Sequence, residues 1–157
     1  MAQNFSEDTM QRIADMRLGC RVERAAAAVT TGPTNYFHVS GGNVLLTGFY
    51  GEITVAQAVA QVLAIDLDVD AGTDVPLGSN GAEANNYVVG RMCYLPAAAG
   101  AVTWSAAGGA CPLEIGPPIV LSPGMITVTS SGSQTTGRMK WALWYVPIED
   151  GAYVEAV

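Results

Sequence analysis

The sequence predicts an all-β fold, a jelly-roll-like β-sandwich, preceded by a short helical arm. The 157 residues are half hydrophobic but only 13% charged, and they are rich in Ala, Val, Gly and Thr, a composition that favours strands and tight turns. Short alternating segments recur between Gly and Pro turn signals, as is typical of sandwiches and barrels. The first 33 residues differ from the rest because they hold most of the arginines and place apolar residues at helical spacing.

The N-terminal segment begins with a helix signal. Ser6 is a suitable N-cap, and acidic residues occupy the turn that follows it. The predicted helix covers about residues 7–18, and the alanines at 25–28 could extend it. A Thr-Thr-Gly-Pro sequence then ends any helix. We therefore expect an arm at residues 1–33 and a β-sandwich domain at residues 34–157.

Strand signals fill the remainder of the chain. Residues 36–39 and 43–50 are predicted strands, and Gly41-Gly42 between them is predicted to form a hairpin turn. Residues 54–70 have some helix propensity, but apolar and other residues alternate along them, so we predict one long strand. Further strands are expected at residues 87–95, 101–106, 119–121, 125–130 and 138–147.

Charge and cysteine content exclude several classes of partner. Residues 1–24 hold four basic and four acidic groups, whereas residues 25–157 hold three basic groups against ten acids and carry the whole net charge of −7. Such a domain repels phosphate backbones, so we expect no nucleic-acid partner. Three widely spaced cysteines and one histidine are too few for a zinc site, and we expect reduced thiols and no cofactor. Neither a leader peptide nor a membrane span is expected.

Motifs that could carry chemistry fail on inspection. Asp66-Leu67-Asp68-Val69-Asp70 begins like a calcium loop but lacks the loop glycine and the closing glutamate. A solvated strand face is the preferred interpretation, with an irregular cation site or an arginine-bearing subunit contact as alternatives. His38 and Ser40 share a strand face without a nucleophile elbow, so packing is the preferred role of His38. We expect that the chain is not an enzyme.

The strand predicted at residues 138–147 has two contrasting faces. Met139, Trp141, Leu143 and Tyr145 alternate along the face predicted to join the core. Lys140 and Trp144 lie on the opposite face. Trp144 either sits under a loop of its own subunit or is buried between subunits, since tryptophan is enriched at interface centres. Trp144 and Lys140 are therefore candidate oligomer-interface residues.

Two stretches resemble a family of small structural proteins of tailed-phage virions. They are Phe37-His38-Val39-Ser40-Gly41-Gly42-Asn43-Val44-Leu45-Leu46-Thr47-Gly48, continuing to Gly51-Glu52-Ile53-Thr54, and Gly137-Arg138-Met139-Lys140-Trp141-Ala142-Leu143-Trp144-Tyr145-Val146-Pro147, closing on Asp150-Gly151-Ala152. The resemblance implies a virion protein, such as a head decoration or cement subunit built on a β-sandwich. It brings no catalytic motif.

This resemblance shapes the expected function. We expect a homo-oligomer, a trimer, that is assembled in the host cytoplasm and binds the major capsid protein on the outside of the capsid without chemistry. The candidate shell contacts come from the arm, which alternatively packs on its own sheet; they are Phe5, Arg12, Arg17, Arg21 and Arg24. One alternative is a tail or head-fibre protein that binds host glycans through Tyr87 beside Asn85 and Asn86. A small hydrolase is the other.

The aspartate run gives a first test. Because it lacks two calcium-loop residues, we expect chelation of divalent cations to leave the thermal unfolding midpoint of the protein unchanged. Differential scanning fluorimetry with and without EDTA measures this. A lowered midpoint that calcium restores would contradict the prediction.

Overall fold

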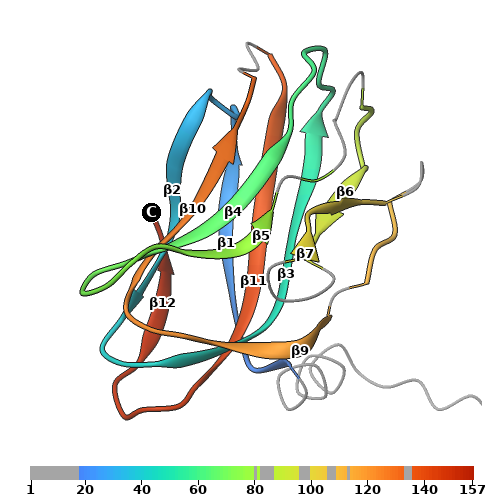
Figure 1. Ribbon diagram of the computed structural model, residues 1–157. Helices are drawn as coiled ribbons and strands as arrows, with labels where there is room; N and C mark the ends of the chain where they lie inside the picture. The colour runs from blue at the N-terminus through green and yellow to red at the C-terminus, as the bar shows by residue number, and fades with distance from the viewer. Residues whose placement is uncertain are drawn as a thin grey trace, which may run out of the picture.

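The structure, a computed structural model, describes residues 18–79, 81, 87–95, 100–105, 109–112, 114–132 and 136–157. Its described part is a sandwich of two β-sheets, which confirms the all-β prediction (Figure 1). The strands are β1 (Cys20–Ala27), β2 (Gly32–Ser40), β3 (Val44–Val55), β4 (Leu63–Val69), β5 (Val75–Ser79), β6 (Met92–Tyr94), β7 (Gly100–Ala101), β8 (Thr103–Trp104), β9 (Glu114–Leu121), β10 (Gly124–Ser130), β11 (Arg138–Pro147) and β12 (Tyr153–Ala156).

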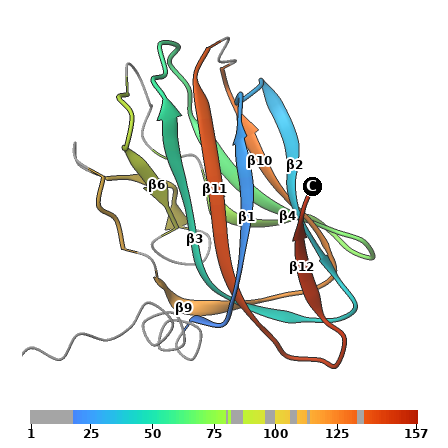
Figure 2. The ribbon, with the colours of Figure 1, turned by 180° about the vertical axis from the view of Figure 1, so that it is seen from behind.

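The strands divide between two sheets. Sheet A has the order β1-β11-β3-β6-β8, with β9 also paired to β3, and sheet B has the order β12-β2-β10-β4-β5-β7. Early strands pair with late ones: β1 with β11, β2 with β10, and β3 with β9, all antiparallel. Seen from behind, β1, β11 and β3 run side by side in front of sheet B (Figure 2). The first and last thirds of the chain are therefore interleaved in both sheets.

An aromatic cluster fills the space between the sheets. Trp141 on β11 is 1% exposed, and its ring centroid lies 5.3 Å from that of Tyr36 on β2 and 5.7 Å from that of Phe49 on β3. Phe37 approaches Phe49 edge-on at 6.1 Å. Gly51 lies directly beneath Trp141, since a Cβ placed there would be 2.6 Å from Trp141 Cζ3. The predicted core face of β11 is confirmed, because Met139, Trp141, Leu143 and Tyr145 are all buried.

Several predicted strands agree with the structure. The segments predicted at 125–130 and 138–147 coincide with β10 and β11 to within one residue. The strands predicted at 36–39, 43–50 and 119–121 are parts of the longer β2, β3 and β9. Of the strand predicted at 87–95 only β6 forms, and the region 101–106 contains two very short strands. Strands β1, β5 and β12 were not predicted.

The single long strand predicted at residues 54–70 is wrong. β3 ends at Val55 in sheet A, and β4 starts at Leu63 in sheet B, so the chain must cross between the layers. Gln57 and Gln61 turn inward at this crossing and are each 1% exposed. Gln61 Nε2 donates to Gln57 Oε1 at 2.8 Å, and Ser130 Oγ donates to Gln61 Oε1 at 3.0 Å. These bonds satisfy both oxygens and the Gln61 amide nitrogen, whereas Gln57 Nε2 is buried without a partner among the described residues.

The predicted hairpin at Gly41-Gly42 is also wrong. β2 lies in sheet B and β3 in sheet A, so the turn connects two sheets rather than two neighbouring strands. Its conformation still requires glycine. Gly41 has a φ of 76°, and a Cβ there would lie 2.1 Å from the carbonyl oxygen of Gly151.

The arm needs the largest correction. The helix predicted at residues 7–18 lies outside the described residues except for Leu18. Residues 20–27, which include the alanines proposed to extend it, form β1 and pair with β11 from Cys20↔Tyr145 to Ala27↔Met139. The boundary predicted between residues 33 and 34 falls inside β2. Residues 18–33 thus belong to the sandwich, because pairing with the buried strand β11 outweighs the high intrinsic helix propensity of alanine.

The contact of Trp141 with Gly51 gives a second test. We expect Gly51→Ala to lower the free energy of unfolding by about 1–3 kcal/mol, because the methyl group would overlap the indole. Gly72→Ala is the matched control, since its nearest neighbour is the side chain of Val69 at 3.3 Å and its φ is not in the left-handed region. Urea unfolding followed by tryptophan fluorescence compares the two. Equal losses of stability in both variants would contradict the prediction.

Candidate functional site

The outer face of sheet A carries a second hydrophobic cluster, separate from the core between the sheets. Trp144 and Ala142 on β11 pack there against Leu18, with Tyr50 of β3 at the margin. Strand alternation explains this, because residues that flank the buried Trp141 and Leu143 must point away from the core. The Thr47 hydroxyl donates to the Leu18 carbonyl and fixes the chain at this point. The three cluster residues are buried, but an antiparallel sandwich usually presents a polar outer face, so the surface at the margin of this cluster is a candidate interaction surface.

Trp144 is largely covered by its own subunit. The ring centroids of Trp144 and Tyr50 lie 5.8 Å apart. On the neighbouring strand β1, the guanidinium carbon of Arg21 lies 5.3 Å from the centroid of the Trp144 ring. Only 7% of Trp144 is exposed. This observation favours the first of the two alternatives for Trp144, and its role between subunits stays a prediction.

A pocket of about 280 Å³ opens beside this cluster. It is lined by two aromatic residues, two sulfur-containing residues and two small ones: Tyr50, Trp144, Met92, Cys111, Gly109 and Ala110. The Cys111 thiol lies 3.5 Å from Met92 Sδ. The lining offers mainly apolar and aromatic contact, so the pocket suits a single hydrophobic side chain better than a polar ligand.

Lys140 lies on the same outer face and is paired within the chain. Its Nζ is 2.9 Å from Glu52 Oε2 on β3. This hydrogen bond is the main reason why the pKa of Lys140 is raised, with a smaller contribution from the nearby negative charge. Because its side chain remains 41% exposed, the ion pair is solvated and contributes little to stability.

The five predicted shell contacts do not form one surface. Phe5, Arg12 and Arg17 lie outside the described residues. Arg21 pairs with Glu23 on the outer face of sheet A. Arg24 points to the other side of β1, where its guanidinium carbon lies 4.2 Å from the Tyr36 ring centroid and its Nε donates to the Val157 carbonyl at 3.0 Å. Arg24 therefore closes the seam between the two sheets.

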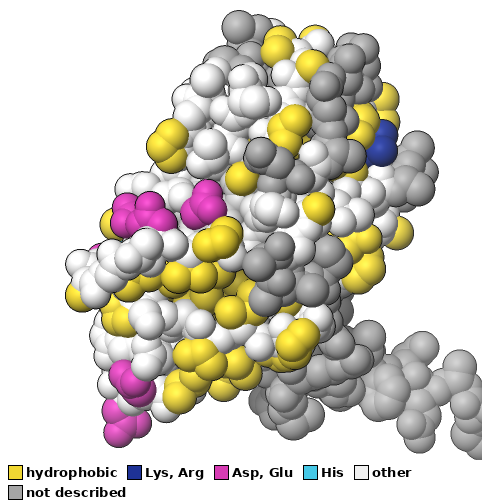
Figure 3. All heavy atoms as spheres, in the orientation of Figure 1, with side chains coloured by type: hydrophobic (Ala, Val, Ile, Leu, Met, Phe, Trp, Pro, Cys, Tyr) yellow, Lys and Arg dark blue, Asp and Glu magenta, His cyan; other side chains and the backbone are white. Residues whose placement is uncertain are grey.

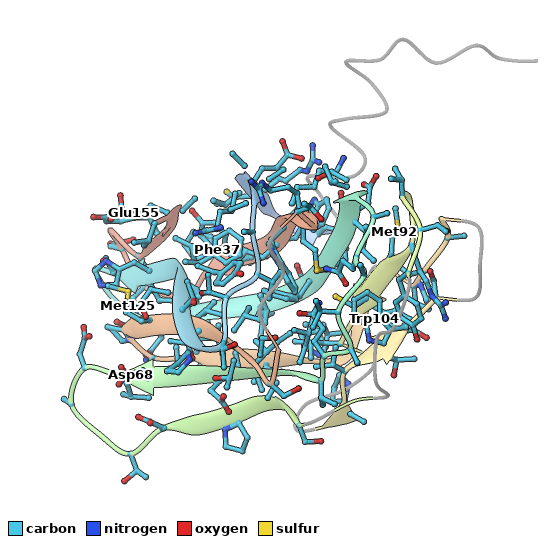
Figure 4. All side chains as sticks on the ribbon, turned by 90° about the horizontal axis from the view of Figure 1, so that it is seen from above. Phe37, Asp68, Met92, Trp104, Met125 and Glu155 are labelled. Atoms are coloured by element: carbon cyan, nitrogen blue, oxygen red, sulfur yellow. The ribbon has the colours of Figure 1, made fainter. Side chains whose placement is uncertain are left out.

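The outer face of sheet B is polar and acidic. Register places Glu155, His38, Met125 and Asp68 in one row across β12, β2, β10 and β4, and the three labelled members lie in line in Figure 4. Carboxylates gather on this side of the molecule, beside hydrophobic side chains over β9 (Figure 3). The described basic groups (Arg21, Arg24, Arg91, Arg138 and Lys140) lie on β1 and β11 or next to β6, all in sheet A. The two sheets thus differ in charge.

His38 and Ser40 are neighbours, but their geometry is unlike that of a catalytic triad. Ser40 Oγ lies 3.1 Å from His38 Nδ1 and 3.3 Å from Nε2, and Glu155 Oε1 lies 3.6 Å from the same Nδ1. In a triad the nucleophile and the acid use opposite ring nitrogens, so that the acid orients the base. Here Ser40 Oγ lies within 3.3 Å of both ring nitrogens, and Glu155 Oε1, 3.6 Å from Nδ1, is beyond hydrogen-bond distance, so Glu155 does not orient the ring on this open strand face.

The aspartate run ends at an exposed hairpin loop, Asp70–Asp74, between β4 and β5. Burial raises the pKa of Asp66, and the charge of Asp74 adds to the effect. Among the described residues no group of three potential ligands is close enough to hold a metal ion. The run is therefore described best by a partly buried Asp66 followed by solvated carboxylates.

Tyr87, proposed as a sugar-stacking residue, is already stacked. The guanidinium carbon of Arg91 lies 3.5 Å from its ring centroid, and Trp104 approaches edge-on at 4.9 Å. Asn85 and Asn86 lie outside the described residues.

Sequence reasoning identified Trp144 but missed the residues that surround it. Tyr50 reaches Trp144 through the pairing of β3 with β11, which follows only from the sheet register. The lengths of two strands cannot reveal that pairing. Cys111 and Met92 carried no periodic signal.

The described part of the chain also has no helix long and apolar enough to cross a membrane. Comparisons with protein-family models, curated proteins and solved structures found no match.

The three thiols give a third test. Cys20 is exposed, Cys111 lines the pocket with its pKa raised mainly by burial, and burial raises the pKa of Cys93 to about 12. Since the thiolate is the reactive form, we expect iodoacetamide to modify Cys20 first, Cys111 more slowly and Cys93 only on unfolding. Mass spectrometry of digests taken over time measures the three rates, with denatured protein as the control. Native Cys93 reacting as fast as Cys20 would overturn the packing described for β6.

Proposed function

We propose that the chain is a structural subunit of a tailed-phage virion, a decoration or cement protein that binds the outside of the capsid without chemistry. The observation that carries this proposal is the way in which the two phage-like stretches meet. Residues 37–54 supply the end of β2 and almost all of β3, and residues 137–152 supply β11 and the following turn. β3 and β11 pair along their whole length, from Arg138↔Val55 to Pro147↔Val44.

The turns of the two stretches also fit together. The Asn43 side chain donates to Glu149 Oε1 at 2.7 Å, and the Ile148 amide donates to the Asn43 carbonyl at 3.0 Å. Gly42 leaves room for Glu149, because a Cβ there would lie 2.5 Å from Glu149 Oε2. Two segments that resemble one family, although they lie far apart in the sequence, thus form one packed unit. This supports a shared fold as the basis of the resemblance.

The strand pairing supports a jelly roll. Pairing of β1 with β11, β2 with β10 and β3 with β9 is the pattern of one long antiparallel ribbon. Rolling that ribbon brings β11 against β3 and β10 against β4, which are the remaining long contacts. Jelly rolls are common among viral capsid domains, so the architecture agrees with a virion role without specifying it.

The capsid protein would contact the outer face of sheet A, including the pocket beside Trp144. Among the described residues, Arg21 is the predicted shell contact that faces outward beside Trp144 and the pocket. A hydrophobic side chain of the shell entering this pocket would give an apolar centre, and Arg21 over the Trp144 ring and Lys140 paired with Glu52 on the same outer face would belong to a polar rim. Cementing then requires a homo-oligomer, for which a trimer is proposed, so that one particle bridges several shell subunits.

The rival functions have less support. Glycan binding through Tyr87 would require a free ring face, and Arg91 lies against that ring. Hydrolysis through Ser40 would require His38 to be oriented by a hydrogen bond to a carboxylate, whereas Glu155 Oε1 lies 3.6 Å from the ring and its side chain is 56% exposed. Neither observation favours a second candidate function.

Virion labelling tests the proposal. Antibodies to the purified chain, with gold conjugates, are applied to intact virions of the phage that encodes it and viewed by negative-stain electron microscopy. We expect gold on the head surface, and virions from a strain with the gene deleted serve as the control. Gold confined to the tail would support a fibre instead, and virions that contain no trace of the chain by mass spectrometry would overturn a virion role altogether.

A further inference from the structure

Among the described strands, the free edges of the two sheets are protected in all but one place. β7 and β8 have two residues each and β12 has four, so these edge strands offer few backbone groups. β9 has eight residues, but Pro117 and Pro118 lie in its middle and cannot donate to another strand. Short strands and prolines are the usual means by which proteins prevent pairing between sheet edges.

β1 is the exception. It is the first strand of sheet A, has eight residues and contains no proline. Figure 2 shows it at the margin of the sheet, with β11 on one side. No other described strand pairs with its second edge. The pairing with β11 is regular from Cys20 to Arg24 and shifts only beyond Arg24. At its Arg24 end this edge lies next to β12, where Arg24 Nε donates to the Val157 carbonyl, and the regular part before Arg24 is open to another strand.

The charges on this edge are complementary to those on the same edge of a second copy. Arg21 and Glu23 lie two residues apart on the outer face of β1 and pair with each other within the chain. In an antiparallel arrangement centred on Val22, residue 21 of one copy stands opposite residue 23 of the other. Arg21 would thus face the partner subunit's Glu23, and Glu23 would face the partner subunit's Arg21. Opposite charges at directly facing positions stabilise antiparallel pairs.

We propose that β1 is a docking edge for a second copy of this chain, which pairs antiparallel about a two-fold axis at Val22. Sheet A of one subunit then continues into sheet A of its partner. Two arginines and two glutamates alternate across the axis and form a four-charge network on the outer face. Such a network contributes more than an isolated surface pair. The contact of Arg21 with the Trp144 ring holds its guanidinium near this position.

The proposal does not rest on the virion role, although both use Arg21, and it specifies one symmetry element. A two-fold contact through β1 makes dimers by itself. Combined with a three-fold contact elsewhere, it makes even-numbered assemblies such as hexamers. A two-fold contact at this edge is an isologous interface, in which each copy contributes the same residues.

Charge exchange tests the proposal. Glu23→Arg places cations at all four positions of the network, and we expect the dissociation constant of the two-fold contact to rise by about ten-fold or more. The double variant Arg21→Glu with Glu23→Arg restores an alternating network, so we expect it to associate as the wild type does. Asp68→Arg makes the same change in net charge on sheet B, away from β1, and is expected to leave association unchanged.

Sedimentation velocity over a range of protein concentrations measures the association, and circular dichroism checks that each variant is folded. Wild-type protein that sediments only as a monomer of 16.3 kDa or only as a trimer would overturn the proposal. So would a folded double variant that fails to associate, because that result would show that the charges act within the chain alone. Labelling of virions, by contrast, would succeed or fail whatever the state of this edge.

Discussion

The packing of one indole ring against a bare backbone determines the spacing of the two sheets. Trp141 rises from sheet A over Gly51, the position directly opposite on β3, and meets Tyr36 from sheet B. Any side chain at position 51 would push the indole toward sheet B and disturb the Phe37–Phe49 contact beside it. Because interiors are densely packed, such a shift would spread through the sandwich. Burial of Trp141 also commits its neighbours on β11 to the outer face, where the candidate interaction surface forms.

Local sequence patterns predicted the structure correctly where a strand has one face in the core. Side chains alternate in direction along β11, so its core face could be assigned before its partners were known, although Ala142 and Trp144 on the other face are also buried. Such patterns did not predict the structure where the chain crosses from one sheet to the other. Gln57 and Gln61 continue an alternating pattern, yet they are buried at a crossing that only the tertiary structure requires. Likewise, the alanines of β1 favour a helix locally, and β11 draws them into a sheet.

The candidate site shows the same difference between what one strand's sequence predicts and what only the tertiary structure determines. Alternation placed Trp144 and Lys140 outside the core, because that depends on one strand alone. The ring stacking with Tyr50 and the ion pair with Glu52 depend on register between strands nearly a hundred residues apart. Arg21 and Arg24 were grouped by their shared charge, but a strand turns residues three apart to opposite sides. One lies over Trp144 and the other seals the core at Tyr36.

The hairpin loop Asp70–Asp74 extends from sheet B, and every residue in it is exposed. Its backbone carries few constraints from the core, and chain length there is inexpensive: each doubling of a flexible loop costs only about 0.6 kcal/mol of closure entropy. Insertion of a peptide would therefore perturb folding little at this point. At the Gly41-Gly42 turn, by contrast, the backbone lies in close contact with Glu149 and Gly151. The protein thus has a natural position for displaying foreign epitopes, and its carboxylates would keep such a graft hydrated.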